Sequence, residues 1–356
     1  MAEQSGRTIG VLTSGGDCSG LNAVIRAVVH RAIQGYGWRV IGILDGTIGL
    51  LERPLRTEEL TLKLFTGNVL RLGGTILGTH NRGDPFDFPI GDGKTEDRSA
   101  QFIDGYRQLG LDGLIGIGGD GSLKILDRLA SQGGFPFIGV PKTIDNDVPM
   151  TEQAVGFSTA VGAAVEALDR LQPTAASHNR VMVLEVMGRD AGHIALYAGI
   201  GGGADVILIP EIPYSMDAIA EQIRKLQARG HKHALVVVAE AAREAGPPRT
   251  GTVPGGVGHE LGQRIAEATG AETRVTVLGH VQRGGGPDAF DRITASAFGV
   301  RAVDLLAEGA QGRMVAWQHR QVVDVSLAEV NARVRPVGLD DTLVITARGL
   351  GICLGD

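Results

Sequence analysis

Short apolar runs rich in Val, Ile and Leu recur along the chain, and most of the gaps between them have helical period. In one such gap, Leu21, Val24, Ile25 and Val28 fall on a single face of a helix. Strands are predicted at 9–13, 38–43, 111–119, 135–140, 180–188, 204–211, 233–240 and 273–280, and helices at 21–33, 157–171, 216–229 and 290–307. Apolar strands that alternate with helices are typical of a parallel sheet buried on both faces. The pattern therefore predicts an α/β protein with doubly wound, mainly parallel, Rossmann-like sheets.

Length and composition agree with a large globular protein. The 356 residues are enough for two such domains, and 43% apolar with 21% charged residues is a globular balance. The 54 glycines favour tight strand-to-helix turns and a backbone that comes close to ligands. A net charge of −6 gives no basic face for phosphate backbones, so no nucleic-acid partner is expected.

Several other classes of protein are disfavoured. The two cysteines, Cys18 and Cys353, are too few for a disulfide framework or a Cys-based zinc site, and the nine histidines show no HExxH spacing. MAEQSGRT is no secretory signal, and no apolar run approaches the about 18 residues that span a membrane. A cytoplasmic protein without a membrane partner is expected, with a long surface loop at 246–256.

Glycines, acids and cations follow the predicted strands, which is where ligands of doubly wound sheets bind. TSGGDCSG follows the first strand, and GGDGS, PKTIDND, MGRDAGH and GHVQRGG each follow a later one. Gly15 and Gly16 stand where a strand feeds a helix, so their bare N–H groups and the helix dipole suit an anion. The alternative is that these glycines only make the turn.

The motif GIGGDGS (116–122) satisfies the letters of the GxGxxG dinucleotide fingerprint. Asp120 would place a negative charge where a pyrophosphate approaches. We therefore interpret its carboxylate as a ligand of a Mg²⁺ ion that phosphates also bind. The Walker pattern is absent, because the glycine that it requires upstream of GKT (93–95) is replaced by Phe88. A surface loop is expected at 93–95.

The stretch PKTIDNDVP (141–149) places two carboxylates, Asp145 and Asp147, between two prolines. Asp, Asn and Pro are ordinary turn residues, so the motif could simply end a strand. The alternative is that one of the aspartates is the working group of an enzyme.

Cations accompany these motifs. Arg189 stands at a strand end that opens a helix, where a guanidinium can bind a phosphate bidentately, although a surface ion pair would explain it too. His280 and Arg283 follow a strand, and Arg180 and Arg274 each precede one. Phosphoryl transfer requires this combination: glycine-rich turns that bind phosphates, an acid that binds Mg²⁺, a further pair of acids and several arginines.

Five motifs, LTSGGDCSGLNAVIR, IGGDGS, PKTIDND, EVMGRDAGH and TVLGHVQRGG…DR, resemble the phosphofructokinases of glycolysis in order and spacing, over roughly 9–305. The resemblance implies transfer of the γ-phosphate of ATP to the 1-hydroxyl of fructose 6-phosphate, with Mg²⁺ as cofactor. It also implies a nucleotide-binding domain (1–156 plus 282–332) and a fructose 6-phosphate-binding domain (157–281 plus 333–356), with the active site in the cleft between them.

The resemblance gives individual residues their roles. Asp145 is expected to be the general base, Thr143 to contact the transferred phosphoryl group, and Arg189 to stabilise developing charge. Asp120 is expected to hold Mg²⁺, supported by Asp147. The other nucleotide contacts implied are Gly15, Gly16, Arg82, Gly83, Gly119, Gly121 and Ser122. Besides Thr143, Asp145, Asp147 and Arg189, the substrate contacts implied are Arg180, Met187, Gly188, Glu240, Arg274, His280 and Arg283.

Two positions bear on the phosphoryl donor. In the family the residue after GGD is glycine in members that use ATP and aspartate in those that use pyrophosphate; here it is Gly121. The second residue of P-x-TIDND is glycine in the best-known bacterial ATP enzymes and lysine in pyrophosphate enzymes; here it is Lys142. Because a carboxylate at 121 would repel an α-phosphate, ATP is the expected donor. A pyrophosphate-dependent enzyme is the alternative.

The resemblance also implies a homo-oligomer, a tetramer or a dimer, because in the family Arg180 and Arg274 come from the neighbouring subunit. Three functions of other kinds stay open. A lipid or NAD kinase would share GGDG but gives no reason for PKTIDND. An NAD-dependent dehydrogenase would bind nicotinamide without Mg²⁺. A silent regulatory subunit is disfavoured by the intact acids and Arg189.

Five further positions bear on regulation. Arg26 and Arg170 match effector-binding positions of the family, whereas His30, Asp205 and His231 replace its Arg, Glu and Lys. The loss of two cations should weaken the binding of phosphoenolpyruvate or ADP, so other effectors stay open.

Cys18 lies within the phosphate loop. It is expected to be a small buried thiol, with a redox switch as the alternative.

Overall fold

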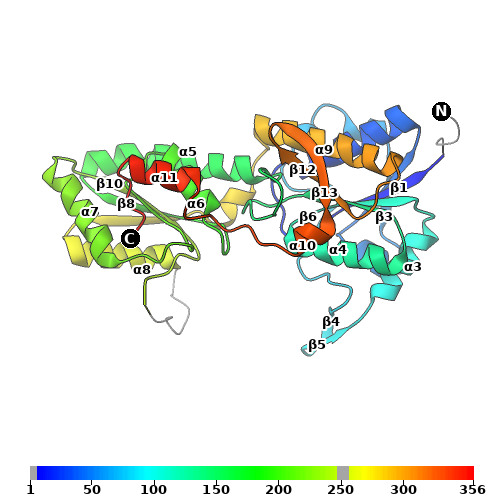
Figure 1. Ribbon diagram of the computed structural model, residues 1–356, viewed down its shortest axis with the longest axis horizontal. Coiled ribbons are helices and arrows are strands. Elements are labelled where there is room, and N and C mark those ends of the chain that lie inside the picture. Colours follow the sequence, from blue (N-terminus) through cyan, green and yellow to red (C-terminus); the bar gives the residue numbers. More distant parts are fainter. Residues whose placement is uncertain (1–5, 247–255) are drawn as a thin grey trace. The chain divides into compact units, whose positions relative to one another are not determined.

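The computed structural model describes residues 6–246 and 256–356 (Figure 1). The chain divides into two compact units, each described here by itself. Unit 1 holds the described residues of Met1–Thr143, Val148–Ser158 and Arg283–Val334, and unit 2 holds those of Ile144–Asp147, Thr159–Gln282 and Arg335–Asp356. The chain thus passes from unit 1 to unit 2 inside PKTIDND. The assignment of one ligand to each domain stays a prediction.

Unit 1 is built on a seven-stranded sheet of order β13-β12-β7-β6-β1-β2-β3. The strands are β1 (Thr8–Thr13), β2 (Arg39–Ile43), β3 (Thr57–Leu60), β6 (Gly113–Gly118), β7 (Phe137–Pro141), β12 (Arg313–Gln318) and β13 (Gln321–Ser326). The five central strands are parallel, and the edge strands β3 and β13 are antiparallel to their neighbours. Every residue of β1, β6 and β7 is buried, because helices cover both faces of the sheet.

The helices of unit 1 lie on both faces of this sheet. They are α1 (Leu21–His30), α2 (Ile48–Leu51), α3 (Ser99–Gln108), α4 (Asp120–Gly133), α9 (Ala289–Ala307) and α10 (Leu327–Asn331), with short turns η1 (Arg31–Gly35), η2 (Leu62–Phe65) and η3 (Val69–Arg71). Gly113 and Gly116 of β6 are three residues apart and so face opposite sides of the sheet. A Cβ added at Gly113 would touch Leu306 of α9, and one added at Gly116 would touch Leu126 of α4. Helix α1 packs against α9. Helices α1 and α4 therefore cover opposite faces.

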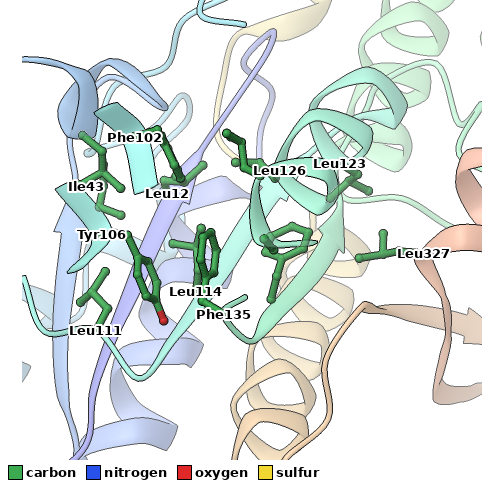
Figure 2. Close-up of a cluster of buried hydrophobic side chains, with 14 of the residues drawn as sticks. Leu12, Ile43, Phe102, Tyr106, Leu111, Leu114, Leu123, Leu126, Phe135 and Leu327 are labelled. Carbon is green, nitrogen blue, oxygen red and sulfur yellow. The ribbon is translucent and has the colours of Figure 1, made fainter. Parts of the chain in front are cut away.

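The core on the α3–α4 face is drawn in Figure 2. Leu12 and Leu114 from the sheet lie among Phe102 of α3, Leu126 of α4 and Leu327 of α10, all of them buried. Full burial of each such side chain stabilises the fold by about 1.5–3 kcal/mol, so this layer fixes the strand ends that carry the polar motifs.

Unit 2 contains a four-stranded parallel sheet of order β11-β8-β10-β9. Its strands are β8 (Val181–Val186), β9 (Val206–Leu208), β10 (Ala234–Ala239) and β11 (Thr273–Val277). Its helices are α6 (His193–Gly201), α7 (Met216–Ala228), α8 (Val257–Thr269), α11 (Thr342–Gly349) and, from its third residue on, α5 (Phe157–His178), with the turn η4 (Gly279–Arg283) at its boundary. Helix α6 packs on β9 and β10, and α8 packs on β8 and β11.

The prediction of two doubly wound, mainly parallel sheets is confirmed, and each predicted strand and helix is present within a few residues. Strands β3, β12 and β13 were not predicted, since polar residues interrupt their apolar pattern. The prediction of a surface loop at 93–95 is wrong. Lys94–Glu96 is strand β5, which pairs with β4 (Phe88–Gly91) as an exposed antiparallel hairpin. Most of the loop expected at 246–256 lies outside the described residues. No helix in the described part of the chain is long and apolar enough to cross a membrane.

Two helical glycines offer a matched test of this packing. A Cβ at Gly299 of α9 would lie 2.7 Å from the backbone oxygen of Val24 in α1, whereas one at Gly162 of α5 would meet nothing within 4 Å. Gly299→Ala should lower the free energy of unfolding by about 1–3 kcal/mol, because the two helices must move apart. Gly162→Ala should raise it by up to about 1 kcal/mol through helix propensity. Urea unfolding followed by circular dichroism measures both, and equal stabilisation by the two variants would contradict the close α1–α9 contact.

Candidate active site

The carboxyl ends of β1 and β6 flank the topological switch point of unit 1. These strands are neighbours, yet the helices that follow them, α1 and α4, cover opposite faces of the sheet. Such a point leaves a crevice that binds ligands in open α/β sheets. The amide of Ser14 donates to Ile117 O (2.9 Å), and Thr79 Oγ1 donates to Gly15 O (2.6 Å). The glycine turn after β1 is therefore braced from two sides.

Two cationic side chains lie on this glycine turn. Lys142, only 4% exposed, donates from Nζ to the backbone oxygen of Gly16. Arg283 donates from Nη1 to Asp17 O (3.0 Å), and a Cβ at Gly16 would come within 2.9 Å of the same Nη1. Glycine at position 16 thus allows the guanidinium to approach the backbone, and the turn carries positive charge suited to an anion.

A cavity of about 310 Å³ opens beside the turn. Its walls are Ser14 and Gly15 at the end of β1, Ser122 in the first turn of α4, and the segment 80–95, which includes Thr95 of β5. The predicted nucleotide residues Arg82 and Gly83 line it as well, so they do gather with Gly15 and Ser122. The hairpin contribution was missed from the sequence, because exposed polar strands give no apolar signal.

Asp120 and Gly121 begin α4 at the same crevice. Both are exposed, Gly119 is the N-terminal cap of the helix, and a Cβ at Gly121 would meet no atom within 4 Å. In the described part of the chain no three His, Cys, Asp or Glu side chains gather as a metal site of their own. One exposed carboxylate fits Mg²⁺ that is held mainly by water and phosphates.

In unit 2, Glu240 holds the MGRD turn that follows β8. Its Oε1 accepts from the amides of Gly188 (3.3 Å) and Arg189 (2.9 Å), and Gln282 Oε1 accepts from the amide of Met187 (2.7 Å). Arg189 has a positive φ of 50°, uncommon for a side chain other than glycine. The carboxylate thus stabilises a strained turn that leaves the Arg189 side chain exposed.

The Asp145–Asp147 turn also belongs to unit 2. Asp145 is 3% exposed, and Asn146 between the two carboxylates is fully buried with φ of 52°. Arg335 donates from Nη1 to the carbonyl of Asn146 (3.1 Å). The sequence gives no signal for this contact, since 189 residues separate the two.

Arg180 and Arg274 both contact Glu272. Arg180 Nη2 lies 2.8 Å and Arg274 Nη2 2.5 Å from Glu272 Oε1, and these guanidinium groups lower the pKa of the Glu272 carboxyl. His280 is exposed in η4, after β11.

A family model for phosphofructokinase matches residues 8–306, which is most of the chain. The ATP-dependent 6-phosphofructokinase 1 of Synechocystis sp. (strain ATCC 27184 / PCC 6803 / Kazusa) is 58% identical over 360 residues, covering 98% of this chain and 99% of that protein. The chain belongs to the phosphofructokinase family. A second relative, the ATP-dependent 6-phosphofructokinase 1 of Nostoc sp. (strain PCC 7120 / SAG 25.82 / UTEX 2576), is also 58% identical and covers 98% of this chain and 99% of its own.

Among solved structures, the phosphofructokinase from Saccharomyces cerevisiae matches with a TM-score of 0.78 and 31% identity. The match covers 92% of this chain but 45% of the yeast chain, so this chain spans less than half of the yeast protein.

The residues predicted from the resemblance to lie at effector-binding positions divide between the units. Arg26 and His30 of unit 1 line a cavity of about 390 Å³ beside α1 and α9. In unit 2, Arg170 pairs with Glu166 on exposed helix surface, and His231 is exposed. Burial raises the pKa of Asp205, whose carboxylate accepts from the amide of Leu235 (2.9 Å).

Cys18 lies in a closed environment behind the glycine turn. It is fully buried, its thiol donates to Val155 O (3.4 Å), and a Cβ at Gly156 would come within 2.4 Å of its sulfur. Burial raises the pKa of Cys18 to about 12, and the nearby Lys142 ammonium offsets this only in part. The expectation of a small buried thiol agrees with this geometry.

The thiol of Cys18 should therefore not react in the native protein. At pH 8 its thiolate fraction is about one in ten thousand, since a pKa about four units higher keeps the thiol protonated. In a Cys353→Ser variant, Ellman's reagent should label nothing until denaturant is added and then one thiol per chain. Rapid labelling of the native variant would instead support a redox switch.

Proposed function

We propose that this protein is an ATP-dependent 6-phosphofructokinase, which transfers the γ-phosphate of ATP to the 1-hydroxyl of fructose 6-phosphate. The observation that carries the proposal is the cationic glycine turn at the switch point of unit 1, with a cavity that continues from it to the β4–β5 hairpin. The names and 58% identity of the full-length cyanobacterial relatives support the same activity.

The nucleotide phosphates would lie on the turn after β1. Gly15 and Gly16 would donate backbone N–H groups, with Arg82 reaching the nucleotide and Gly83, Gly119 and Ser122 lining its site. The Gly15 amide donates to His80 O (3.3 Å) in this structure and would exchange or share that long hydrogen bond with a phosphate. Lys142 adds a cation at the same turn. The nucleoside would extend toward Thr95 and the hairpin, which a bare pyrophosphate donor would not reach.

Asp145 would take the proton from the 1-hydroxyl as that oxygen attacks the γ-phosphorus. The bond from the γ-phosphorus to the bridging oxygen breaks, and ADP leaves. A carboxylate serves as general base when its geometry is held, and burial of the turn supports such a role. Thr143 would contact the transferred phosphoryl group, and the Arg189 guanidinium would stabilise its developing charge.

Asp120 would hold Mg²⁺ on the nucleotide phosphates, with Asp147 supporting that network. When bound, the ion would neutralise charge on the phosphoryl oxygens.

The sugar phosphate would be bound by cations and by the turn after β8. Arg180, Arg274, His280 and Arg283 would supply positive charge, and Met187, Gly188 and Glu240 would line the sugar. Arg180 and Arg274 would reach the site of a neighbouring subunit, so the protein would be a homo-oligomer, a tetramer or a dimer. It would act in the cytoplasm. Allosteric control would use effectors other than the usual phosphoenolpyruvate or ADP, because His30 and His231 stand where cations are expected.

The pyrophosphate alternative rests on one observation, the Lys142 ammonium at the glycine turn. Gly121 weighs more heavily against it, because the space at its Cβ position is open and would be free for an α-phosphate.

A phosphoryl-transfer assay with fructose 6-phosphate and Mg²⁺ should show turnover with ATP and at most a trace with pyrophosphate. Gly121→Asp should lower kcat/KM for ATP by about 100-fold or more, since the carboxylate would oppose an α-phosphate at short range. Coupled detection of fructose 1,6-bisphosphate measures both donors.

Gly121→Ala is the matched control and should change kcat/KM for ATP by less than about tenfold. An added Cβ meets no atom there, so a loss in Gly121→Asp reports charge and not misfolding. Turnover of the unaltered protein with pyrophosphate alone would overturn the assignment of the donor.

Asp145→Asn should lower kcat by about 100- to 10,000-fold, the usual contribution of a general base. The KM values and the melting temperature should change little, since the amide has nearly the same shape. Asp169→Asn, on the exposed surface of α5, should leave kcat unchanged. An undiminished kcat in Asp145→Asn would remove that residue from its role.

A further inference from the structure

The Asp145–Asp147 turn contains a residue in the left-handed backbone region, Asn146. Asn146 adopts φ of 52° while fully buried, with Asp145 before it and Asp147 after it. Asparagine tolerates this conformation better than most residues, but the orientation of its peptide planes still depends on what the backbone contacts. Contacts to the Asn146 backbone therefore decide where the two carboxylates point.

Arg335 makes such a contact. Its Nη1 donates to the carbonyl of Asn146 at 3.1 Å, a hydrogen bond from a charged donor. The carbonyl belongs to the peptide plane between Asn146 and Asp147, so holding it fixes the chain on both sides of the plane.

The backbone of Arg335 is itself held by His193, the first residue of α6. His193 Nε2 lies 3.2 Å from Arg335 O, and because a carbonyl oxygen only accepts, this ring nitrogen carries a proton. Burial lowers the pKa of His193, which favours the neutral ring with that tautomer. The ring is 5% exposed and lies four residues after Arg189.

Glu211 anchors the other end of the same short segment. Its Oε1 accepts from the amide of Val337 (2.8 Å) and from the amide of Gly192 (3.0 Å), which caps α6. Residues 335–337 are thus tied at two points to the start of α6, and through Arg335 to the carboxylate turn.

We infer that Arg335 is a positioning residue for Asp145: its guanidinium holds the Asn146 carbonyl, while His193 and Glu211 fix the segment that carries it. The inference rests on the proposed function, because it gives Asp145 the role of general base. In this scheme Arg335 acts by orienting the carboxylate.

Replacing Arg335 by Met removes the donor but keeps the length of the side chain. Arg335→Met should lower kcat by about 10- to 100-fold, the scale of effect that a small misplacement of a reacting group produces. The KM values for ATP and fructose 6-phosphate should stay within about threefold, since neither ligand contacts Arg335 in this scheme. Arg335→Lys keeps a cationic donor and should recover part of the lost kcat.

Arg333→Met, two residues earlier and exposed, is the matched control and should leave kcat unchanged. If Arg335→Met matches this control, the inference fails. If it raises KM by the same factor that it lowers kcat/KM, Arg335 binds a ligand and the inference also fails. Should Arg335→Met not fold, a lower kcat with unchanged KM values in a folded His193→Ala variant would still support it, and an unchanged kcat in that variant would overturn it.

The double variant separates this inference from the proposed function. If Arg335 acts through Asp145, then Asp145→Asn with Arg335→Met should be no slower than Asp145→Asn alone. A further drop of 10- to 100-fold in the double variant would show that Arg335 acts elsewhere. Full activity of Asp145→Asn by itself would instead overturn the role proposed for Asp145, whatever Arg335 does.

Discussion

Burial of both faces of each parallel sheet is the constraint from which the rest of the structure follows. Strands β1, β6 and β7 of unit 1 and three of the four strands of unit 2 are buried throughout, and Val, Ile, Leu, Ala and Gly make up most of their residues. A polar group placed on such a face would lose its hydration without a partner, which costs several kcal/mol. Ligand-binding groups are consequently confined to the strand ends, where backbone and side chains meet solvent.

At the strand ends of unit 2, several acidic side chains accept hydrogen bonds from backbone amides. Glu240 accepts from the amides of the turn after β8, Glu211 from Gly192 and Val337, and Glu185 from the amide of Gly258 at the start of α8 (2.6 Å). Burial raises the pKa of Glu185, as expected for a carboxylate held inside the sheet layer. These contacts satisfy amides that would otherwise lack partners at helix and strand termini. They stabilise turns such as Gly188–Arg189, in which Arg189 has a positive φ that residues other than glycine seldom adopt.

In unit 1, cationic side chains donate hydrogen bonds to the backbone carbonyl groups of a turn. The carbonyl groups of Gly16 and Asp17 accept from Lys142 and Arg283, so the turn after β1 gathers positive charge beside its free surface. Glycine at position 16 lets the Arg283 guanidinium lie close to the backbone, because a Cβ there would come within 2.9 Å of Nη1 and displace it. The same crowding behind the turn closes off the Cys18 thiol. The cationic turn and the buried thiol therefore share one tightly packed backbone segment.

The sequence by itself determined the fold class and the places where polar motifs interrupt it. The spacing of apolar residues and their share of each strand indicate which strands are buried. Strands buried on both faces that alternate with helices are typical of a doubly wound sheet. The sequence also placed Gly15, Gly16, Asp120 and Gly121 at strand ends, since those motifs follow apolar runs directly. Tertiary structure alone decided the contacts between distant segments: Arg335 on Asn146, Arg283 on Asp17, and the β4–β5 hairpin beside Ser14. Such contacts depend on which strand ends become neighbours in the sheet, and neither period nor spacing records that order.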